Sequence, residues 1–463
     1  MGKLQILTYN ARSLKDNRAI LEDLAAKHQI DVLLVQETRA KDTPDIRGYT
    51  GYSLKWQAAA GGPLGLSTYI KTGITRMVGR ARLARSKRQN SHIPALQRPD
   101  GTRAETEAER AEALVDRYLY VHKMTEDLGN PTAPVEEVIR RYLRGCAPDS
   151  RLKTTAEELE SEIKKLKVKK APGADGIPNA AIKHLPPKIV QQTAVIFNEC
   201  LKKSYFPSIW KTATIQPIPK PGKDPTLPAS HRPISLLSNL GKLLERIIAK
   251  RLTEYLEEND LLNVQQYGFR RQHSTTHALM EFSDVATLAM SLGKHLGAVL
   301  LDASEAFPTM NHALLLHKMA ALKFSPATVK LVKRYLEDRP FTVRVGEAQS
   351  TRRIMPQGTP QGSCLGPLLF IIYINSIKGL DSLQILYADD TTIYDGHKKA
   401  TELRQLLQNK LDRVARYMDR SKIQLNAAKT QAIIITRRRT EKDPGGPYAY
   451  SGRTSSGRMR PPC

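Results

Sequence analysis

The strongest constraint on the fold is the tetrapeptide Tyr387-Ala388-Asp389-Asp390, which joins two short apolar runs at 383–387 and 391–394. Two such runs with a tight connection predict a β-hairpin that carries both aspartates at its tip. Successive strand side chains point to opposite faces, so only one of the two can face the core. Adjacent carboxylates repel unless a cation compensates them. The pattern fits either a divalent-cation site or a polar turn, where Asp is common.

A third carboxylate, Asp302, ends the apolar run at 297–301. An aspartate at the end of a buried strand is costly unless it is solvated or paired. It could alternatively cap the segment that follows. Phosphoryl and nucleotidyl transfer use two hard cations held by a few carboxylates, and one strand-end Asp plus two at a hairpin tip supply that set. We therefore predict that Asp302, Asp389 and Asp390 form one site.

Between these carboxylates lies the loop 356–370, which places three Gly and three Pro before an apolar helix. Such a loop lets backbone approach a ligand closely, although it could also be an ordinary connection. The chain also has 72 basic and 46 acidic residues, a net charge of +26, which favours a polyanionic partner such as nucleic acid.

Cysteine spacing and hydropathy indicate where such a chain works. The four cysteines form no C-x-x-C pair, which argues against a zinc finger and against a disulfide framework. The longest apolar run, at 368–374, is far short of the roughly 20 residues of a membrane span, and the start lacks a secretory signal. We expect no membrane segment and a soluble, intracellular protein.

Seven segments, in order from about 150 to 435, resemble the reverse transcriptase domain of non-LTR (LINE-type) retrotransposons, most like the jockey-type elements. Segment 169–178 resembles the entry motif, and segments 231–248 and 266–279 resemble the fingers motifs. The palm motifs are matched by LLDASEAF, PQGSCLGPLLFIIYIN and YADD, and LNAAKT at 425–430 resembles the lysine motif that follows. The resemblance implies an α+β right-hand polymerase fold with helical fingers and an antiparallel palm sheet.

The resemblance also implies an RNA-directed DNA polymerase acting on an RNA template, a DNA primer or target and dNTPs. Asp302, Asp389 and Asp390 would bind two Mg²⁺ ions, assisted by the backbone carbonyl of Ala303. Phe307 would exclude a 2′-hydroxyl, unless it is a core aromatic. The other implied nucleotide-site residues are Gln361, Gly362, Arg270 or Arg271, and Lys429, which could instead be a surface lysine.

Residues 1–79 resemble the start of the endonuclease that precedes the polymerase in this family. Strands are expected at 4–9, 31–36 and 66–70, with a helix at 14–27. Asn10 and Glu37 match the first two site motifs, and Glu37 would be a metal ligand. The later Asp-x-Asn and Ser-Asp-His motifs have no counterpart between 70 and 147, so we expect a truncated α/β fragment without cleavage activity.

These resemblances predict five regions. Residues 1–79 form the endonuclease-like fragment, 80–150 a connecting region that is partly helical, 151–296 the fingers and 297–435 the palm, while 436–463 form a disordered basic tail. The helical part of the connection is expected at 104–124, and amphipathic helices are expected at 188–204 and 240–257. Because the family acts on chromosomal DNA, the nucleus or a cytoplasmic ribonucleoprotein is the expected location.

The chain departs from the family pattern in ways that leave its activity open. Pro308 stands where the family usually has Asp, and would be tolerated as the first residue of a helix. Glu305 replaces a frequent Lys, and Ser376 a common Asp. The primer grip, thumb and Cys/His knuckle have no counterpart after 430. The alternatives are therefore an active polymerase, a decayed remnant that only binds nucleic acid and, least favoured, a surviving endonuclease.

Overall fold

The structure, a computed structural model, describes residues 93–124, 133–145, 149–379 and 384–436, the strands 6–10, 32–36, 49–57 and 63–71, and the helical residues 19, 22, 23 and 26. The chain divides into two compact units, 1–92 and 93–463. Each unit is considered by itself. Within the described residues, no helix is long and apolar enough to cross a membrane.

The first unit contains a four-stranded mixed sheet in the order β1-β2-β4-β3. Its strands are β1 (Ile6–Asn10), β2 (Val32–Gln36), β3 (Tyr49–Gln57) and β4 (Pro63–Lys71). β1 and β2 run parallel and the other neighbours antiparallel. Three of the strands were predicted from apolar runs, whereas β3 was not. Most of the helix predicted at 14–27 lies outside the described residues.

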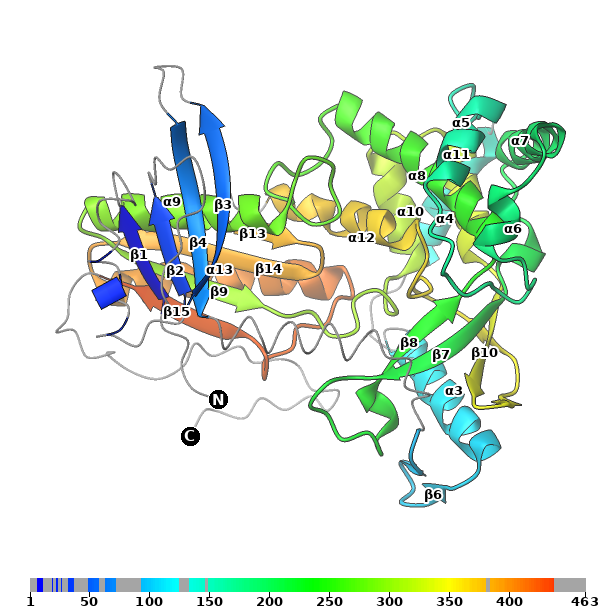
Figure 1. Ribbon diagram of the computed structural model, residues 1–463, viewed down its shortest axis with the longest axis horizontal. Coiled ribbons are helices and arrows are strands. Elements are labelled where there is room, and N and C mark those ends of the chain that lie inside the picture. Colours follow the sequence, from blue (N-terminus) through cyan, green and yellow to red (C-terminus); the bar gives the residue numbers. More distant parts are fainter. Residues whose placement is uncertain are drawn as a thin grey trace. The chain divides into compact units, whose positions relative to one another are not determined.

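The second unit has a four-stranded sheet in the order β13-β14-β9-β15, in which every pair is antiparallel. It lies in the region predicted as the palm and is named here the palm sheet. Its strands are β9 (His295–Leu301), β13 (Gln384–Tyr387), β14 (Asp390–His397) and β15 (Gln431–Ile435). The apolar runs predicted β9, β13 and β14 correctly. An antiparallel sheet is therefore present in the region predicted as the palm (Figure 1).

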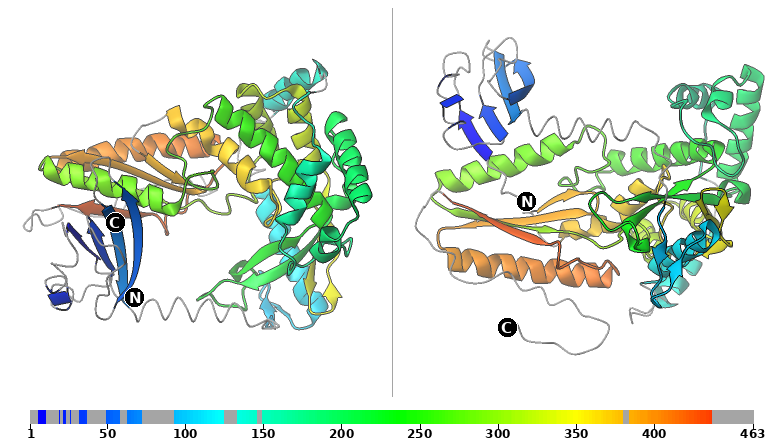
Figure 2. Two further views of the ribbon diagram at one scale, coloured as in Figure 1. Left: turned by 45° about the horizontal axis from the view of Figure 1, so that its top comes forward. Right: turned by 60° about the horizontal axis from the view of Figure 1, so that its bottom comes forward.

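Two helices cover the opposite faces of the palm sheet (Figure 2). Leu296 and Ala298 of β9 pack with α9 (Thr275–Ser291), whereas Gly297 lies against Leu403 and Leu407 of α13 (Ala400–Arg420). This division follows from the two-residue period of a strand. Both faces of β9 are therefore covered by helices, and Asp302 follows directly after the end of this strand.

A second sheet has the order β11-β10-β7-β8, with β12 beside β10. Its strands are β7 (Ala213–Pro219), β8 (His231–Leu236), β10 (Arg339–Val345), β11 (Ala348–Gln349) and β12 (Arg353–Met355). The pairing of β10 with β7 is parallel and joins segments predicted as palm and fingers. The two predicted regions therefore share one sheet.

The helix α3 (Glu107–Lys123) confirms the helix predicted at 104–124 and packs on this second sheet. Thr106 and Glu109 form a capping box at its start. Leu114, Val115 and Tyr118 are buried against Ile215 and Phe341 of β7 and β10. Residues 93–124, which were expected to belong to a connection, therefore contribute to the core of the second unit.

The remaining helices surround the largest core cluster of the second unit. The amphipathic helices predicted at 188–204 and 240–257 are confirmed as α7 (Pro187–Lys202) and α8 (Asn239–Glu258). The strongly apolar α12 (Gly366–Ile374) is almost wholly buried. The other helices are α4 (Ala133–Tyr142), α5 (Ala156–Lys164), α6 (Asn179–Lys183), α10 (His312–Ala321), α11 (Pro326–Leu336) and short 3-10 helices at 143–145, 208–210, 228–230 and 375–379. The second unit also contains the small hairpin of β5 (Leu96–Gln97) and β6 (Arg103–Ala104).

Candidate active site

The predicted hairpin places two of the three carboxylates. β13 ends at Tyr387, and Ala388 turns the chain with a left-handed φ of 61° before Asp389 and the start of β14. The pairing of Thr391 with Leu301 puts the next two positions, Asp390 and Asp302, opposite each other at one end of the sheet. The end of β9 and the start of β14 therefore lie side by side, with Asp389 in the adjoining turn.

The carboxylates at this sheet end carry excess negative charge. Burial raises the pKa of Asp389, and the charge of Asp302 raises it further. Burial also raises the pKa of Asp390, followed by the charges of Asp389 and Asp302. Both shifts mean that the ionised forms lack enough nearby positive charge.

Among the described residues, Lys429 is the one cation within hydrogen-bond distance of Asp302. It belongs to the segment that resembles the lysine motif. Lys429 Nζ lies 3.1 Å from Asp302 Oδ2. The Lys429 side chain is 61% exposed and that of Asp302 is 32% exposed. Lys429 therefore forms an exposed ion pair with Asp302, a contact that the sequence analysis did not specify.

Carboxylate oxygens are the ligands that Mg²⁺ prefers, so the donor chemistry at this sheet end suits a divalent cation. The described residues nevertheless include no group of three His, Cys, Asp or Glu side chains close enough to hold a metal ion. The backbone of Ala303 pairs with Leu425, and the hydrogen bonds of that bridge flank the pair. The carbonyl of Ala303 therefore points away from Leu425.

The turn after Asp302 carries Phe307, whose ring lies 4.8 Å from that of Phe370 on α12. Phe307 is half-buried, so it has both a core contact and an accessible part. Pro308 lies within this turn, and α10 starts only at His312. Pro308 is therefore not the first residue of a helix, the condition under which the sequence analysis would accept it; the turn is closed by Thr309 N–H donating to the carbonyl of Glu305.

The Gly- and Pro-rich loop before α12 packs on this turn through its backbone. Gly358 N–H donates to Met310 O, and Thr359 N–H donates to Phe307 O. Gly358 has a φ of +75°, and a Cβ there would lie 2.1 Å from the Pro308 carbonyl. The close backbone approach at Gly358 is therefore made to the protein's own turn, whereas the predicted approach to a ligand stays a prediction.

Gln361 and Gly362 lie further along the same loop and are exposed. The carbonyl of Gln361 accepts from Ser235 N–H of β8 at 2.8 Å, and Gly362 has a φ of +113°. The loop therefore connects the second sheet to the turn after Asp302. Both residues remain accessible to a ligand.

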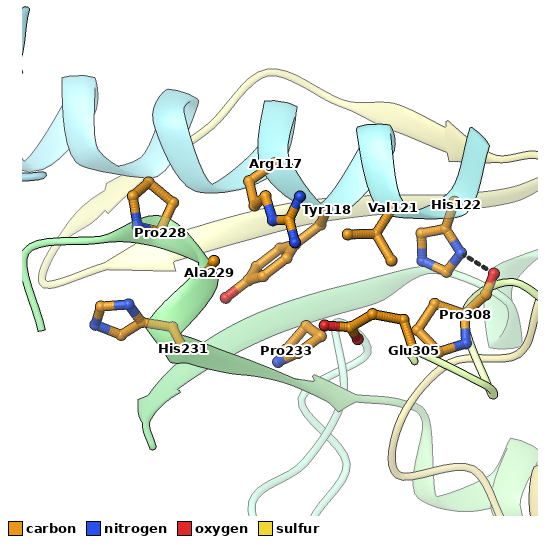
Figure 3. A pocket seen from close by; sticks show the side chains of 10 residues that line it. All are labelled: Arg117, Tyr118, Val121, His122, Pro228, Ala229, His231, Pro233, Glu305 and Pro308. Carbon is orange, nitrogen blue, oxygen red and sulfur yellow. Dashed lines mark hydrogen bonds between the residues drawn. The ribbon is translucent and has the colours of Figure 1, made fainter. Parts of the chain in front are cut away.

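Sequence reasoning missed His122, which lies at one end of a pocket beneath α3 (Figure 3). His122 is 5% exposed, and its Nδ1 lies 2.9 Å from Pro308 O and 2.8 Å from Gln357 O. Carbonyls only accept, so Nδ1 carries the proton. Burial lowers the pKa of His122 to about 4, which keeps it neutral. One side chain thus ties α3 to both the turn and the loop, a contact that local sequence patterns do not reveal.

The structure separates the two basic residues that the resemblance left open. Arg270 makes two hydrogen bonds to Glu257 and one to Asn263 O, and its side chain is only 14% exposed. Arg271 is exposed. A cation that the sequence analysis did not select, Lys220 after β7, lies 3.8 Å from Glu305 in the turn that carries Phe307.

The two residues of the endonuclease-like fragment are only partly placed. Asn10 is the last residue of β1, at the same end as the paired Gln36 of β2. Glu37 lies outside the described residues. The expected tail from 437 onward also lies outside them.

Comparisons with known proteins agree with the motif analysis. A sequence model of the family "Reverse transcriptase (RNA-dependent DNA polymerase)" matches residues 218–450. The chain is 38% identical over 283 residues to a probable RNA-directed DNA polymerase from transposon BS of Drosophila melanogaster, covering 59% of this chain and 31% of that protein. It is 34% identical over 367 residues to the RNA-directed DNA polymerase from mobile element jockey of Drosophila melanogaster, covering 76% of this chain and 39% of that protein.

The chain therefore spans between about a third and two fifths of the length of these relatives. Among solved structures, an apo telomerase from Candida tropicalis truncated from its C-terminal domain is 13% identical, with a TM-score of 0.37, covering 50% of this chain and 51% of that chain.

Proposed function

The chain belongs to the reverse transcriptase (RNA-dependent DNA polymerase) family, and on that premise we propose that it is the RNA-directed DNA polymerase of a jockey-like, non-LTR retrotransposon. The observation that carries this proposal is the convergence of Asp302, Asp389 and Asp390 at one sheet end with raised pKa values at the latter two. A carboxylate set that lacks compensating charge is suited to a cationic cofactor. An RNA template, a DNA primer and dNTPs are the proposed partners.

Asp302, Asp389 and Asp390 would hold two Mg²⁺ ions, assisted by the carbonyl of Ala303, which does not bond to Leu425 across its bridge. Bound there, Mg²⁺ would activate the primer 3′-hydroxyl and stabilise charge on the phosphate that it attacks. Lys429 contributes positive charge at Asp302, where it can also donate a proton toward departing pyrophosphate. The protein's own work is to fix these carboxylates at two neighbouring strand ends.

The nucleotide would lie over the turn after Asp302. Phe307 is anchored on Phe370 beside the carboxylates, which suits a side chain that excludes a 2′-hydroxyl. Gln361 and Gly362 are accessible on the adjoining loop. Of the candidate triphosphate contacts, Arg271 is accessible, whereas Arg270 is held by Glu257.

Primer extension on a homopolymer RNA template with dNTPs and Mg²⁺ tests this proposal. We expect incorporation by the parent chain and its loss in the Asp389→Asn, Asp390→Asn double variant. Asp419→Asn is the matched control, because Asp419 is an exposed carboxylate on α13. Equal incorporation by the double variant would refute the assignment of these residues.

A binding-only remnant is the second candidate, favoured by the Lys429–Asp302 ion pair and by the lack of a preformed three-ligand cluster among the described residues. It predicts salt-dependent binding of RNA without preference for sequence. A folded parent that binds RNA but incorporates no nucleotide would establish this alternative over the polymerase.

For the first unit we propose an endonuclease-like fragment without cleavage activity. The parallel pairing of β1 with β2 supports an α/β fragment. It brings together Asn10 at the end of β1 and Gln36 at the end of β2, which directly precedes Glu37. Incubation with supercoiled plasmid and Mg²⁺ should give no nicked product. Nicking that is lost in Glu37→Ala would overturn this assignment.

A further inference from the structure

A short segment before α9 lies along the hairpin that carries two of the carboxylates. Gln266 bridges to Leu386 of β13 in a parallel sense. Tyr267 N–H donates to Leu386 O at 2.8 Å, and Leu386 N–H donates to Gln265 O at 2.9 Å. Residues 265–268, named here the brace, therefore add a further strand-like edge beside β13, immediately before the Ala388 turn.

The side chain of Gln266 extends this pairing into the turn. Its Oε1 accepts from Ala388 N–H at 3.1 Å and from Gly268 N–H at 2.9 Å. Because two N–H groups converge on one atom, that atom is the amide oxygen. Gln266 is 1% exposed and Ala388 is 4% exposed, so water cannot replace this acceptor. Without Gln266, a buried N–H of the turn would have no partner.

Backbone packing makes the same contact very close. A Cβ on Gly268 would lie 2.3 Å from Ala388 N and 2.8 Å from the Tyr387 carbonyl carbon. Only a residue without a side chain fits between the brace and the turn. The left-handed Ala388, which a non-glycine residue adopts at a cost, is thus held by a hydrogen bond and by contact.

The residues on either side of the brace are anchored to two other elements. Asn375, which follows α12, accepts from Asn263 N–H at 2.8 Å and donates to Leu261 O at 2.7 Å. Arg270 donates to Asn263 O while its guanidinium binds Glu257 of α8. Arg270 therefore has an observed role in holding this segment, which explains why it is not exposed.

We propose that Gln266 is a positioning residue for nucleotidyl transfer: its Oε1 holds the Ala388 turn left-handed and so fixes where Asp389 and Asp390 point. This inference rests on the proposed polymerase function. Gln266 does not touch substrate in this assignment, and it acts only through the turn. Loss of Gln266 is expected to lower turnover while the KM for dNTP changes little, because Phe307 and the loop at 356–362 are not part of the brace.

The closing experiment compares Gln266→Ala with Asn198→Ala. Asn198 is a matched control, because its amide also accepts from and donates to buried backbone, that of Thr154, far from the hairpin in sequence. Hydrogen exchange of a peptide spanning 384–391 should accelerate about 10- to 100-fold in Gln266→Ala and stay unchanged in Asn198→Ala. Turnover should fall by a similar factor in Gln266→Ala alone.

Gln266→Ala combined with Ala388→Gly provides the rescue test. Glycine adopts the left-handed turn without strain, so the second change should restore about tenfold of the lost turnover. Unchanged exchange in folded Gln266→Ala, or exchange that changes without any fall in turnover, would overturn the proposal. Hydrogen exchange needs no polymerase activity, so an inactive parent would refute the proposed function while the exchange result still decides whether the brace holds the turn.

Discussion

Two carboxylate sites in the second unit lie in opposite electrostatic environments. In the region predicted as the fingers, Glu158 of α5 accepts hydrogen bonds from Lys250 and Arg251 of α8 and from Thr154. Although burial opposes the shift, these partners lower the pKa of Glu158 to about 2. In the palm, burial and neighbouring negative charge raise the pKa of Asp389. A compensated carboxylate holds structure together, whereas an uncompensated one is a cost that function can explain.

The largest expected effect is at Asp389, where one substitution should lower activity and raise stability. Asp389→Asn should lower nucleotide incorporation by about 10³-fold or more, because a metal ligand contributes several kcal/mol to transition-state charge stabilisation. The same change should raise the melting temperature of the metal-free protein, since it removes charge that burial and Asp302 destabilise. Steady-state incorporation and calorimetry without divalent cations measure the two effects. A lower melting temperature would contradict the comparison.

At Glu158 the expected change in stability has the opposite sign to that at Asp389. Glu158→Gln should lower the free energy of unfolding at pH 7 by about 3 kcal/mol, which corresponds to the depression of the Glu158 pKa from 4.5 to about 2. A depressed carboxylate pKa stabilises the fold above the unfolded pKa, so this difference should shrink as pH falls from 4.5 toward 2. Urea unfolding of both proteins at several pH values measures it, with Glu160→Gln as an exposed control on α5.

His122 offers a third case, a buried group kept neutral. Its pKa is lowered from 6.5 to about 4 by burial, so protonation is easier in the unfolded chain than in the folded one. The contribution of His122 to stability is complete above pH 6.5 and is lost as pH falls toward 4. Between pH 7 and pH 5 the parent should lose about 2 kcal/mol more than His122→Gln. If urea unfolding shows that both proteins lose the same free energy of unfolding between pH 7 and pH 5, His122 is not the group that causes the acid sensitivity.

The smallest effect is expected at the exposed ion pair of the palm. Lys429→Met should change the free energy of unfolding by less than about 1 kcal/mol, because exposed pairs are solvated and screened by salt. Chemical unfolding alongside Lys398→Met, an exposed lysine elsewhere in the palm, supplies the control. A large loss of stability in Lys429→Met alone would show that the palm carboxylates are more fully compensated than the comparison states.

Sequence patterns predicted the parts of this site that depend on local order. The apolar runs before Asp302 and around Asp389 specified three neighbouring strands of the palm sheet, because strand formation and the placement of strand-end residues are local properties. The sequence analysis predicted only that the three carboxylates share one site, and the position of Asp302 opposite Asp390 comes from the strand register in the structure.

Contacts between distant segments were beyond such patterns. The parallel pairing of β10 with β7 and the burial of α3 on the second sheet depend on tertiary packing. Arg270 looked like a substrate-binding cation because its partner Glu257 lies on a separate helix. His122 gave no local signal, and Gln266 was assigned no role although it begins a segment that resembles a fingers motif. The contacts of both residues are made with backbone groups that are distant in sequence.

The burial of α3 has a consequence for how such genes can recombine. The family match begins at residue 218, inside β7, whereas the compact unit begins at Ile93. A crossover at 218 would divide the central strand of one sheet and separate Leu114 and Tyr118 from the surface that buries them. A crossover near 92 would leave the apolar core of the second unit intact. The segment that matches the family is thus shorter than the compact unit that must stay in one piece for its core to form.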